Sequence, residues 1–229
     1  GGGTSDFTLF RAEGNGIGII ASHGIRLGGT DFDHAVSMTH AMPELGLGGE
    51  LHRTFGEGLL PVPKPIYVDL ATWAKIPFLY TAETARAVAD MEAHAVDPAR
   101  MARLATVIED QLGHELAFAV ERGKIGANGP EGAGQIDMGM VERGLTVRTT
   151  AGSVNAALSE AREALRGAIY DTLVAGDVAP GQVSSVILVG GSSLMGLVQE
   201  EAQGICPTAT LRRSEAFTAV VDGLALATA

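Results

Sequence analysis

The sequence predicts an α/β fold in which a mainly helical segment interrupts a core of strands and helices. Strand-like runs occur near both ends of the chain, at residues 6–10 and 185–189, whereas long helical patterns fill the middle. The core subdomain is therefore assigned to residues 1–27 together with 151–229, and the inserted helical subdomain to residues 28–150. We expect the two strand-like runs to belong to one sheet.

The first predicted elements are a β-hairpin and a helix. Apolar Phe7 and Leu9 alternate with polar residues, and a second, isoleucine-rich run covers residues 16–25. The glycines and the asparagine between the two runs favour a tight turn. A helix is predicted over residues 30–45. Residues 43–80 hold five of the nine prolines and are predicted to form a loop-rich segment.

Two helices are predicted in the middle of the chain, the first over residues 81–95. The second starts at Asp97 and Pro98, which are residue types preferred at an N-cap and at the first helical position, and it ends near Gly126. Apolar residues recur in it at spacings of three and four and are predicted to be core: Met101, Leu104, Ala105, Ile108, Leu112, Leu116, Ala119 and Val120.

Strands and helices alternate in the last part of the chain. Short strands are predicted near residues 134–140 and 144–149, and Ser153 is predicted to cap the helix that follows. Residues 185–189 are nearly all apolar, which is typical of a strand in the middle of a sheet with both faces covered. A closing helix is predicted over residues 215–227.

Composition argues against several classes of partner. The net charge of −11 disfavours nucleic acid, because its phosphates would be repelled. No apolar run reaches the roughly 20 residues that a membrane span needs. The single cysteine, Cys206, fits a reducing, cytoplasmic setting. The sequence lacks an initiating methionine and begins directly before a strand, so we expect it to be part of a longer chain.

Three glycine-rich turns carry the functional signal: residues 1–4 before the first strand, residues 28–31 before a helix, and residues 190–193 between a strand and a helix. Such turns let backbone N–H groups and a helix dipole approach a phosphate. One turn is weak evidence, whereas three together indicate a nucleotide site, although neither the Walker A nor the dinucleotide pattern is present. From the residues alone, residues 1–4 are equally consistent with a flexible linker, and Asp6 with an exposed carboxylate at a strand edge.

Five motifs, in this order, resemble those of the heat shock protein 70 (DnaK-like) family. They are GGGTSD at residues 1–6, LGGTDFD at 27–33, VERGK at 120–124, VILVGGSSLM at 186–195 and AVVDGLALA at 219–227. The segment MPELGLGGE at residues 42–50 resembles the short, YegD-like branch of that family. The resemblance implies the C-terminal lobe of an actin-like ATPase domain, with a ribonuclease H-like fold and a separate N-terminal lobe.

The resemblance also implies roles for individual residues. Thr4 and Asp6 match catalytic positions, and Asp6 would hold magnesium through water. The residues implied to contact ATP or ADP are Gly1, Gly2, Gly3, Thr4, Gly29, Glu121, Lys124, Asn128, Gly190, Gly191, Ser192 and Met195. Catalysis at such a site rests on positioning and charge stabilisation. The whole protein is then expected to be an ATP-hydrolysing, chaperone-like protein with client proteins and co-chaperones as partners, and residues 1–229 alone are expected to be inactive.

The chain departs from the family at four positions. Ile125 and Leu194 stand where arginine usually stacks on adenine, Thr30 replaces an acidic residue, and Phe217 replaces an aspartate. Each missing cation–π partner is worth about 0.5–2 kcal/mol. Two alternatives therefore stay open: a non-enzymatic protein-interaction module with a decayed nucleotide pocket, and another actin-like enzyme such as a sugar kinase. Lys124 is expected to be a flexible side chain that reaches solvent.

Overall fold

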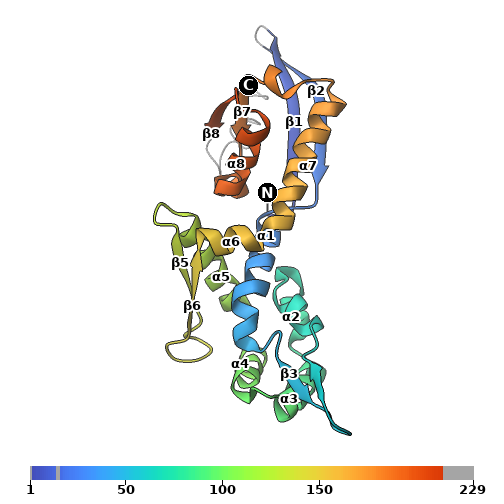
Figure 1. Cartoon of the computed structure of the whole chain (residues 1–229), viewed down its shortest axis with the longest axis vertical. Helices are drawn as coiled ribbons and strands as arrows, with labels where there is room; N and C mark the ends of the chain where they lie inside the picture. Colours follow the sequence, from blue (N-terminus) through green and yellow to red (C-terminus); the bar gives the residue numbers. More distant parts are fainter. Residues whose placement is uncertain (1, 14–15, 214–229) are drawn as a thin grey trace. The chain divides into compact units, whose positions relative to one another are not determined.

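The computed structural model describes residues 2–13 and 16–213 and is a mixed α/β structure with small sheets. The chain divides into two compact units (Figure 1). Unit 1 consists of Gly1–Thr30 and Leu158–Ala229, and unit 2 is the intervening segment Asp31–Ala157. The two boundaries predicted from the sequence lie after residues 27 and 150. The parts of the predictions that lie outside the described residues are Gly1, the hairpin tip at 14–15, Phe217 and the helix at 215–227.

The β-hairpin predicted at the start of unit 1 is confirmed. β1 (Ser5–Glu13) pairs antiparallel with β2 (Gly16–Ile25), and the register shifts between Leu9 and Phe10. Half-buried and exposed residues alternate along the first half of β1. One face of the hairpin is therefore packed and the other is open, as expected for an antiparallel pair at the surface.

Two helices and a second pair of strands complete unit 1. α7 (Ser159–Ala175) packs against both strands of the hairpin and against α8 (Gly196–Ile205), as Figure 1 shows. β7 (Ser185–Leu188) and β8 (Thr210–Arg213) pair in parallel. Single 3-10 turns cover Pro180–Gln182 and Gly191–Leu194. A small apolar core is formed by Leu173, Ile205, Cys206 and Ala209, with Leu9, Ile169, Val178, Val183 and Val186 packed against it.

Ion pairs tie α7 to α8. Arg166 Nε donates to Glu201 Oε2 at 2.7 Å, and Arg162 Nη1 donates to Glu201 Oε1 at 2.8 Å. Arg162 Nη2 also donates to Glu200 Oε2 at 2.7 Å. The Glu201 side chain is 4% exposed, so the two guanidinium groups compensate for its lost hydration. Hydrogen bonds from Arg166 and Arg162 hold the pKa of Glu201 below its usual value of 4.5.

The prediction that residues 6–10 and 185–189 share one sheet is wrong for the described part of the chain. β1 pairs with β2 and β7 pairs with β8, in two separate two-stranded sheets. The run at residues 185–189 is also not covered on both faces, because Ile187 in β7 is 46% exposed and Val189, directly after it, is 45% exposed. An apolar run indicates that a strand is buried, but it does not indicate which strands pair with it.

Unit 2 begins with a helix that changes its hydrogen-bonding pattern. α1 (Gly29–Val36) crosses the division and continues as a π-type turn over Ser37–Ala41 and a 3-10 turn over Met42–Leu45. The predicted helix at 30–45 is therefore confirmed in extent but is irregular in its second half. Residue Gly46 closes it in the left-handed region, at φ 100°.

The segment predicted to be loop-rich holds several short elements. β3 (Glu50–His52) pairs antiparallel with β4 (Leu59–Pro61). α2 (Pro65–Leu70) and a 3-10 stretch over Trp73–Leu79 follow. Proline stands at the first position of α2, where its missing N–H costs nothing. The prolines of this segment thus begin short helices as well as interrupt them.

The middle of unit 2 is helical, as predicted, but contains three helices rather than two. Thr81 caps α3 (Ala82–His94), and Asp97 caps α4 (Pro98–Glu109). A break with Gln111 at φ 56° separates α4 from α5 (Gly113–Asn128). Within residues 2–13 and 16–213, no helix combines the length and the apolar character needed to cross a bilayer.

The prediction of a single helix from Pro98 to Gly126 is therefore wrong. The break was missed because the spacing of the apolar residues is the same before and after it. Six of the eight residues predicted to be core are buried: Met101, Leu104, Ile108, Leu116, Ala119 and Val120 are at most 3% exposed. Ala105 and Leu112 are only half-buried. Periodicity reports which side is buried, and that signal is the same on both sides of a one-turn interruption.

A second hairpin lies on α5. β5 (Ala133–Asp137) pairs antiparallel with β6 (Thr146–Thr150), and both strands pack against α5. α6 (Ala151–Ala157) follows directly. Ser153 was predicted to cap this helix but lies inside it; Thr150 Oγ1 accepts the Ser153 N–H at 3.0 Å, and Ser153 Oγ accepts the Thr150 N–H at 3.0 Å. The cap is thus Thr150, three residues earlier.

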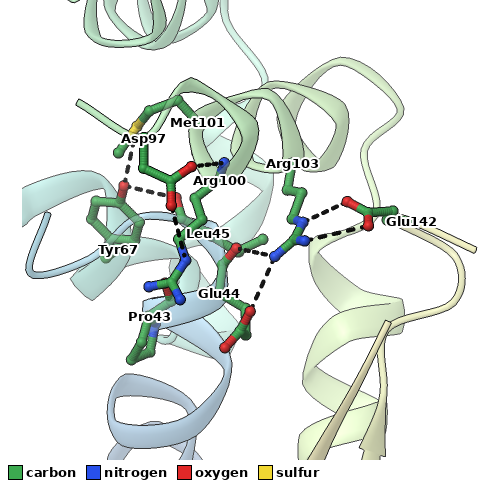
Figure 2. A network of polar contacts seen from close by, with 9 residues as sticks. All are labelled: Pro43, Glu44, Leu45, Tyr67, Asp97, Arg100, Met101, Arg103 and Glu142. Atoms are coloured by element: carbon green, nitrogen blue, oxygen red, sulfur yellow. Dashed lines mark hydrogen bonds and ion pairs between the residues drawn. The ribbon is translucent and has the colours of Figure 1, made fainter. Parts of the chain in front are cut away.

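A polar network around Arg103 joins distant parts of unit 2 (Figure 2). Arg103 Nη1 donates to Glu44 Oε2 at 3.0 Å and to the Glu44 carbonyl at 3.2 Å, while Arg103 Nε donates to Glu142 Oε2 at 2.6 Å. The buried Tyr67 hydroxyl donates to the Leu45 carbonyl at 3.0 Å, and burial raises the pKa of Tyr67. The 3-10 turn that holds Glu44 and Leu45 is therefore fixed from two sides.

Candidate functional site

The three glycine-rich turns, far apart in the sequence, meet within unit 1. The Gly2 carbonyl oxygen accepts hydrogen bonds from the Thr30 N–H at 2.9 Å and from the Thr30 hydroxyl at 2.8 Å. A methyl group placed on Gly29 would lie 3.4 Å from Ser192 Oγ and 4.0 Å from the Gly2 carbonyl oxygen. Residues from the first, second and third turns thus surround one point of unit 1.

The first turn is open to solvent. Gly2, Gly3 and Thr4 are all exposed. A methyl group added to Gly2 or to Gly3 would meet no atom within 4 Å. The backbone here has open space beside it, which is the condition for a charged group such as a phosphate to approach a main chain without side chains.

In the third turn, the conformational constraint falls on Gly190. Gly190 has φ 87°, in the left-handed region, and its carbonyl oxygen accepts the Ser193 hydroxyl at 2.6 Å. Gly191 begins the 3-10 turn and has no positive φ. Met195 is 6% exposed, so its side chain packs in the interior of unit 1. The turn therefore offers its backbone and Ser192, rather than Met195, to a ligand.

A glycine on the neighbouring strand leaves room for the Asp6 carboxylate. Asp6 is exposed and lies opposite Gly24 in the hairpin register. A methyl group on Gly24 would come within 2.9 Å of Asp6 Oδ1. Gly24 was not predicted to have a role, although a glycine opposite a carboxylate in a predicted hairpin indicates a close approach at that position.

The residues around Asp6 fit an indirect contact to a magnesium ion but not a set of direct ligands. Across the described ranges, no group of three or more His, Cys, Asp or Glu side chains is arranged to hold a metal. A single exposed carboxylate beside an open glycine turn fits an ion that keeps its water and takes its other ligands from phosphate oxygens. The predicted role of Asp6, through water, is compatible with that geometry.

The predicted adenosine contacts of unit 2 lie on α5. Glu121 is half-buried and Asn128 is exposed. Lys124 is only 6% exposed, and its Nζ lies 2.7 Å from Asp33 Oδ1 on α1. The expectation of a flexible, solvent-reaching Lys124 is therefore wrong. The tertiary fold instead pairs the Lys124 ammonium with Asp33 on α1.

The pair of Asp33 and Lys124 is close but not ideally aligned. Asp33 Oδ1 is buried and has no hydrogen bond of good geometry among the described residues, despite the short distance to Nζ. Burial raises the pKa of Asp33 above 3.8; the Lys124 ammonium opposes that shift and the Glu121 carboxylate adds to it. Two carboxylates and one ammonium thus share this part of unit 2.

The glycines of the α5 motif serve packing. A methyl group on Gly123 would lie 2.6 Å from Ile136 Cγ1, and one on Gly126 would lie 2.9 Å from Gly134 Cα. The buried Thr149 hydroxyl donates to the Gly123 carbonyl at 2.8 Å. α5 therefore approaches β5 more closely than any larger residue at these positions would allow.

Both positions that lack the expected arginine carry exposed apolar side chains. Ile125 on α5 is 57% exposed and Leu194 in the third turn is 43% exposed. Each presents an apolar surface at which a base can lie, without the positive charge that strengthens stacking.

No family model matches the chain.

Proposed function

We propose that residues 1–229 are the C-terminal lobe of an actin-like ATPase domain, in a protein related to the heat shock protein 70 (DnaK-like) family and its YegD-like branch. The observation that carries the proposal is the meeting of Gly2, Gly29 and Ser192 at one point of unit 1. The β1–β2 hairpin brings Gly2 and Gly29 together locally. Ser192 lies more than a hundred residues further along the chain and has no local reason to join them, whereas a phosphate-binding site requires this convergence.

In the proposed site, the open backbone at Gly2 and Gly3 receives the β- and γ-phosphates of ATP, beside the Thr4 hydroxyl. Asp6 orients the water shell of a magnesium ion, and Gly24 keeps room for that carboxylate. When bound, magnesium neutralises developing charge on the phosphates. The chain's own contribution is positioning, because donors held in a fixed backbone turn stabilise charge without reorganising.

The resemblance implies adenosine contacts in the third turn of unit 1 and, separately, on α5 of unit 2. Gly190, Gly191 and Ser192 supply backbone and hydroxyl groups. On α5, the resemblance implies contacts from Glu121 and Asn128 to ribose and adenine. Lys124 is assigned a positioning role, because its ammonium is already engaged by Asp33 inside unit 2. The chaperone-like activity, client proteins and co-chaperones rest on the resemblance alone, and the cytoplasmic location rests on the single cysteine, Cys206; all are part of the proposal.

Nucleotide titration into the ¹⁵N-labelled chain tests the proposal. Magnesium with ADP or ATP should shift the amide signals of Gly2, Gly3, Gly29 and Ser192. Gly3→Val should abolish these shifts, because the added side chain enters open space that the phosphate needs. Gly181→Val is the matched control, since a methyl group there also meets no atom within 4 Å. It should leave the shifts intact.

Three other outcomes have defined meanings. No shift at millimolar nucleotide would replace the proposal by the protein-interaction module. Shifts that persist in Gly3→Val would show that the nucleotide binds elsewhere. Shifts of the same amides caused by a hexose, in the absence of nucleotide, would favour the sugar-kinase alternative.

A further inference from the structure

Three aromatic side chains of unit 2 form an exposed group that the proposed function does not use. Trp73, the only tryptophan, packs its ring against His114 and Phe118 on α5, at centroid distances of 4.5 and 5.1 Å. Trp73 is nonetheless 43% exposed, and Phe118 is 48% exposed. Single exposed apolar residues are ordinary, whereas adjoining exposed aromatic rings indicate a contact surface. These three residues are called the aromatic corner below.

The rings of the aromatic corner stand nearly perpendicular to one another. The planes of Trp73 and His114 meet at 67°, and those of Trp73 and Phe118 meet at 70°. His114 and Phe118 are four residues apart and therefore lie on one side of α5. Rings in this arrangement leave part of their surface uncovered, in agreement with the exposure of Trp73 and Phe118. Because the face of an aromatic ring carries negative potential, such a surface favours a cation.

Carboxylates without a cationic partner lie at the start of α5. Glu115 is exposed and stands between His114 and Phe118 in the sequence, and Glu109 and Asp110 are exposed just before the helix. No ion pair within residues 2–13 and 16–213 involves any of these three carboxylates. Unit 2 as a whole carries 17 acidic and 10 basic side chains. This negative charge opposes the positive end of the α5 dipole and is complementary to a cationic ligand.

The basic side chains closest in the sequence leave one end of the corner negative. Lys75, in the same 3-10 stretch as the tryptophan, is paired with Asp69, and its Nζ lies 2.7 Å from Asp69 Oδ1. Arg122 is exposed but lies one turn beyond Phe118 along α5. Glu115 precedes Phe118, on the opposite end of this stretch of helix. A cation at the corner is therefore attracted towards Glu115 and repelled by Arg122.

The exposed ring surface has the size of a small ligand. Because an aromatic side chain can bury about 150–250 Å², two rings at about half exposure offer roughly 200 Å² in all. A stable protein partner covers about 800 Å² on each side. The aromatic corner alone therefore fits one cationic head group rather than the surface of a protein.

We propose that the aromatic corner binds a small quaternary ammonium compound, with the cationic head over the rings of Trp73 and Phe118 and with Glu115 as its counter-charge. A primary ammonium group is strongly hydrated and would lose water at the rings. A quaternary ammonium group has no N–H, so its methyl groups contact a ring face directly while its charge interacts with the ring quadrupole. The site lies in unit 2 alone and needs no nucleotide.

Choline is the probe, and the fluorescence of Trp73 is the readout. Choline chloride should change the fluorescence saturably, with a Kd in the millimolar range, whereas sodium chloride at the same concentrations should not. The neutral analogue 3,3-dimethyl-1-butanol has the shape of choline, with a carbon atom in place of the nitrogen. It should bind about fivefold more weakly or not at all, because it lacks the charge that attracts the rings and Glu115.

Two variants locate the site. Glu115→Gln should weaken choline binding about threefold and leave the neutral analogue unaffected. Glu57→Gln, an equal change of charge at another exposed position of unit 2, is its control and should have no effect. Phe118→Leu keeps an apolar side chain but removes a ring, so it should also weaken choline binding; Phe55→Leu, at an 88% exposed phenylalanine, is the matched control. If a variant fails to fold, choline and its neutral analogue still test the proposal on the unaltered chain.

Equal binding of choline and 3,3-dimethyl-1-butanol would overturn the proposal, since charge would then play no part. A fluorescence change that does not saturate, or that sodium chloride reproduces, would overturn it as well. Unchanged choline binding in both Glu115→Gln and Phe118→Leu would place the cation elsewhere.

A peptide that carries trimethyllysine separates two sources of the same chemistry. If it binds more than about tenfold more tightly than choline, and the unmodified lysine peptide does not, the occupant is a modified polypeptide and the assignment to a small molecule is wrong. None of these measurements includes nucleotide, so their failure leaves the proposed ATPase function standing, and the reverse also holds.

Discussion

Replacing Asp33 by asparagine should destabilise unit 2 strongly, although the shape of the side chain is kept. Asp33 Oδ1 lies 2.7 Å from Lys124 Nζ, and the two side chains are 23% and 7% exposed. Breaking a buried ion pair leaves a charge without compensation, at a cost of about 3–5 kcal/mol. Because Asp33 is partly exposed, we expect the lower end, about 3 kcal/mol.

Lys124→Met should respond differently to pH. It keeps the apolar stem but leaves the Asp33 carboxylate unpaired, so the already raised pKa of Asp33 rises further. A folded-state pKa above the unfolded value means that the folded state binds the proton more readily. The stability of Lys124→Met should therefore recover as the pH falls from 7 toward the acid range, whereas Asp33→Asn should show no such recovery.

Urea unfolding followed by tryptophan fluorescence measures both effects. Trp73 is the only tryptophan and belongs to unit 2, where its ring packs on His114 and Phe118 at centroid distances of 4.5 and 5.1 Å. The double variant Asp33→Asn with Lys124→Met should be more stable than either single variant, by about 1–3 kcal/mol. Losses that simply add in the double variant would refute the assignment of this pair.

Three further predictions concern unit 1. Gly190→Ala should lower the free energy of unfolding by about 1–2 kcal/mol, because Gly190 has a positive φ, whereas Gly191→Ala should not. Thermal unfolding followed by circular dichroism measures both variants, and equal losses would contradict the prediction. Gly24→Ala should displace the Asp6 carboxylate and weaken magnesium-dependent nucleotide binding without affecting magnesium-free binding, as measured by calorimetric titration. Glu201 has a lowered pKa, so its contribution to stability should be present above pH 4.5 and be lost as the pH falls through the folded-state value; Glu201→Gln should flatten the dependence of Tm on pH in this range.

Features set by neighbouring residues could be predicted from the sequence. The hairpin, the Asp97 cap and the buried stripe of α4 and α5 follow from alternation, capping chemistry and periodicity within a few residues. The break at Gln111 could not be predicted, because a left-handed residue that is not glycine leaves no clear signal in the sequence.

Features that depend on distant partners were beyond sequence reasoning. The apolar composition of residues 185–189 predicted a central strand, but pairing between strands is decided by the tertiary fold. Lys124 was expected to reach solvent, whereas its ammonium is buried against Asp33 on α1. For the candidate site, the sequence identified the three turns. The structure added that Thr30 bonds the Gly2 carbonyl and that Gly24 leaves room for the Asp6 carboxylate.

The Arg103 network has a consequence for local opening of unit 2. One guanidinium group holds Glu44 in a 3-10 turn and Glu142 beyond β5, and it does so from the middle of α4 (Figure 2). None of these segments can leave its place without breaking charge-assisted hydrogen bonds to the other two. Amide protons in all three should therefore exchange in one shared opening event, as in a single foldon. In Arg103→Met they should exchange independently and at different rates.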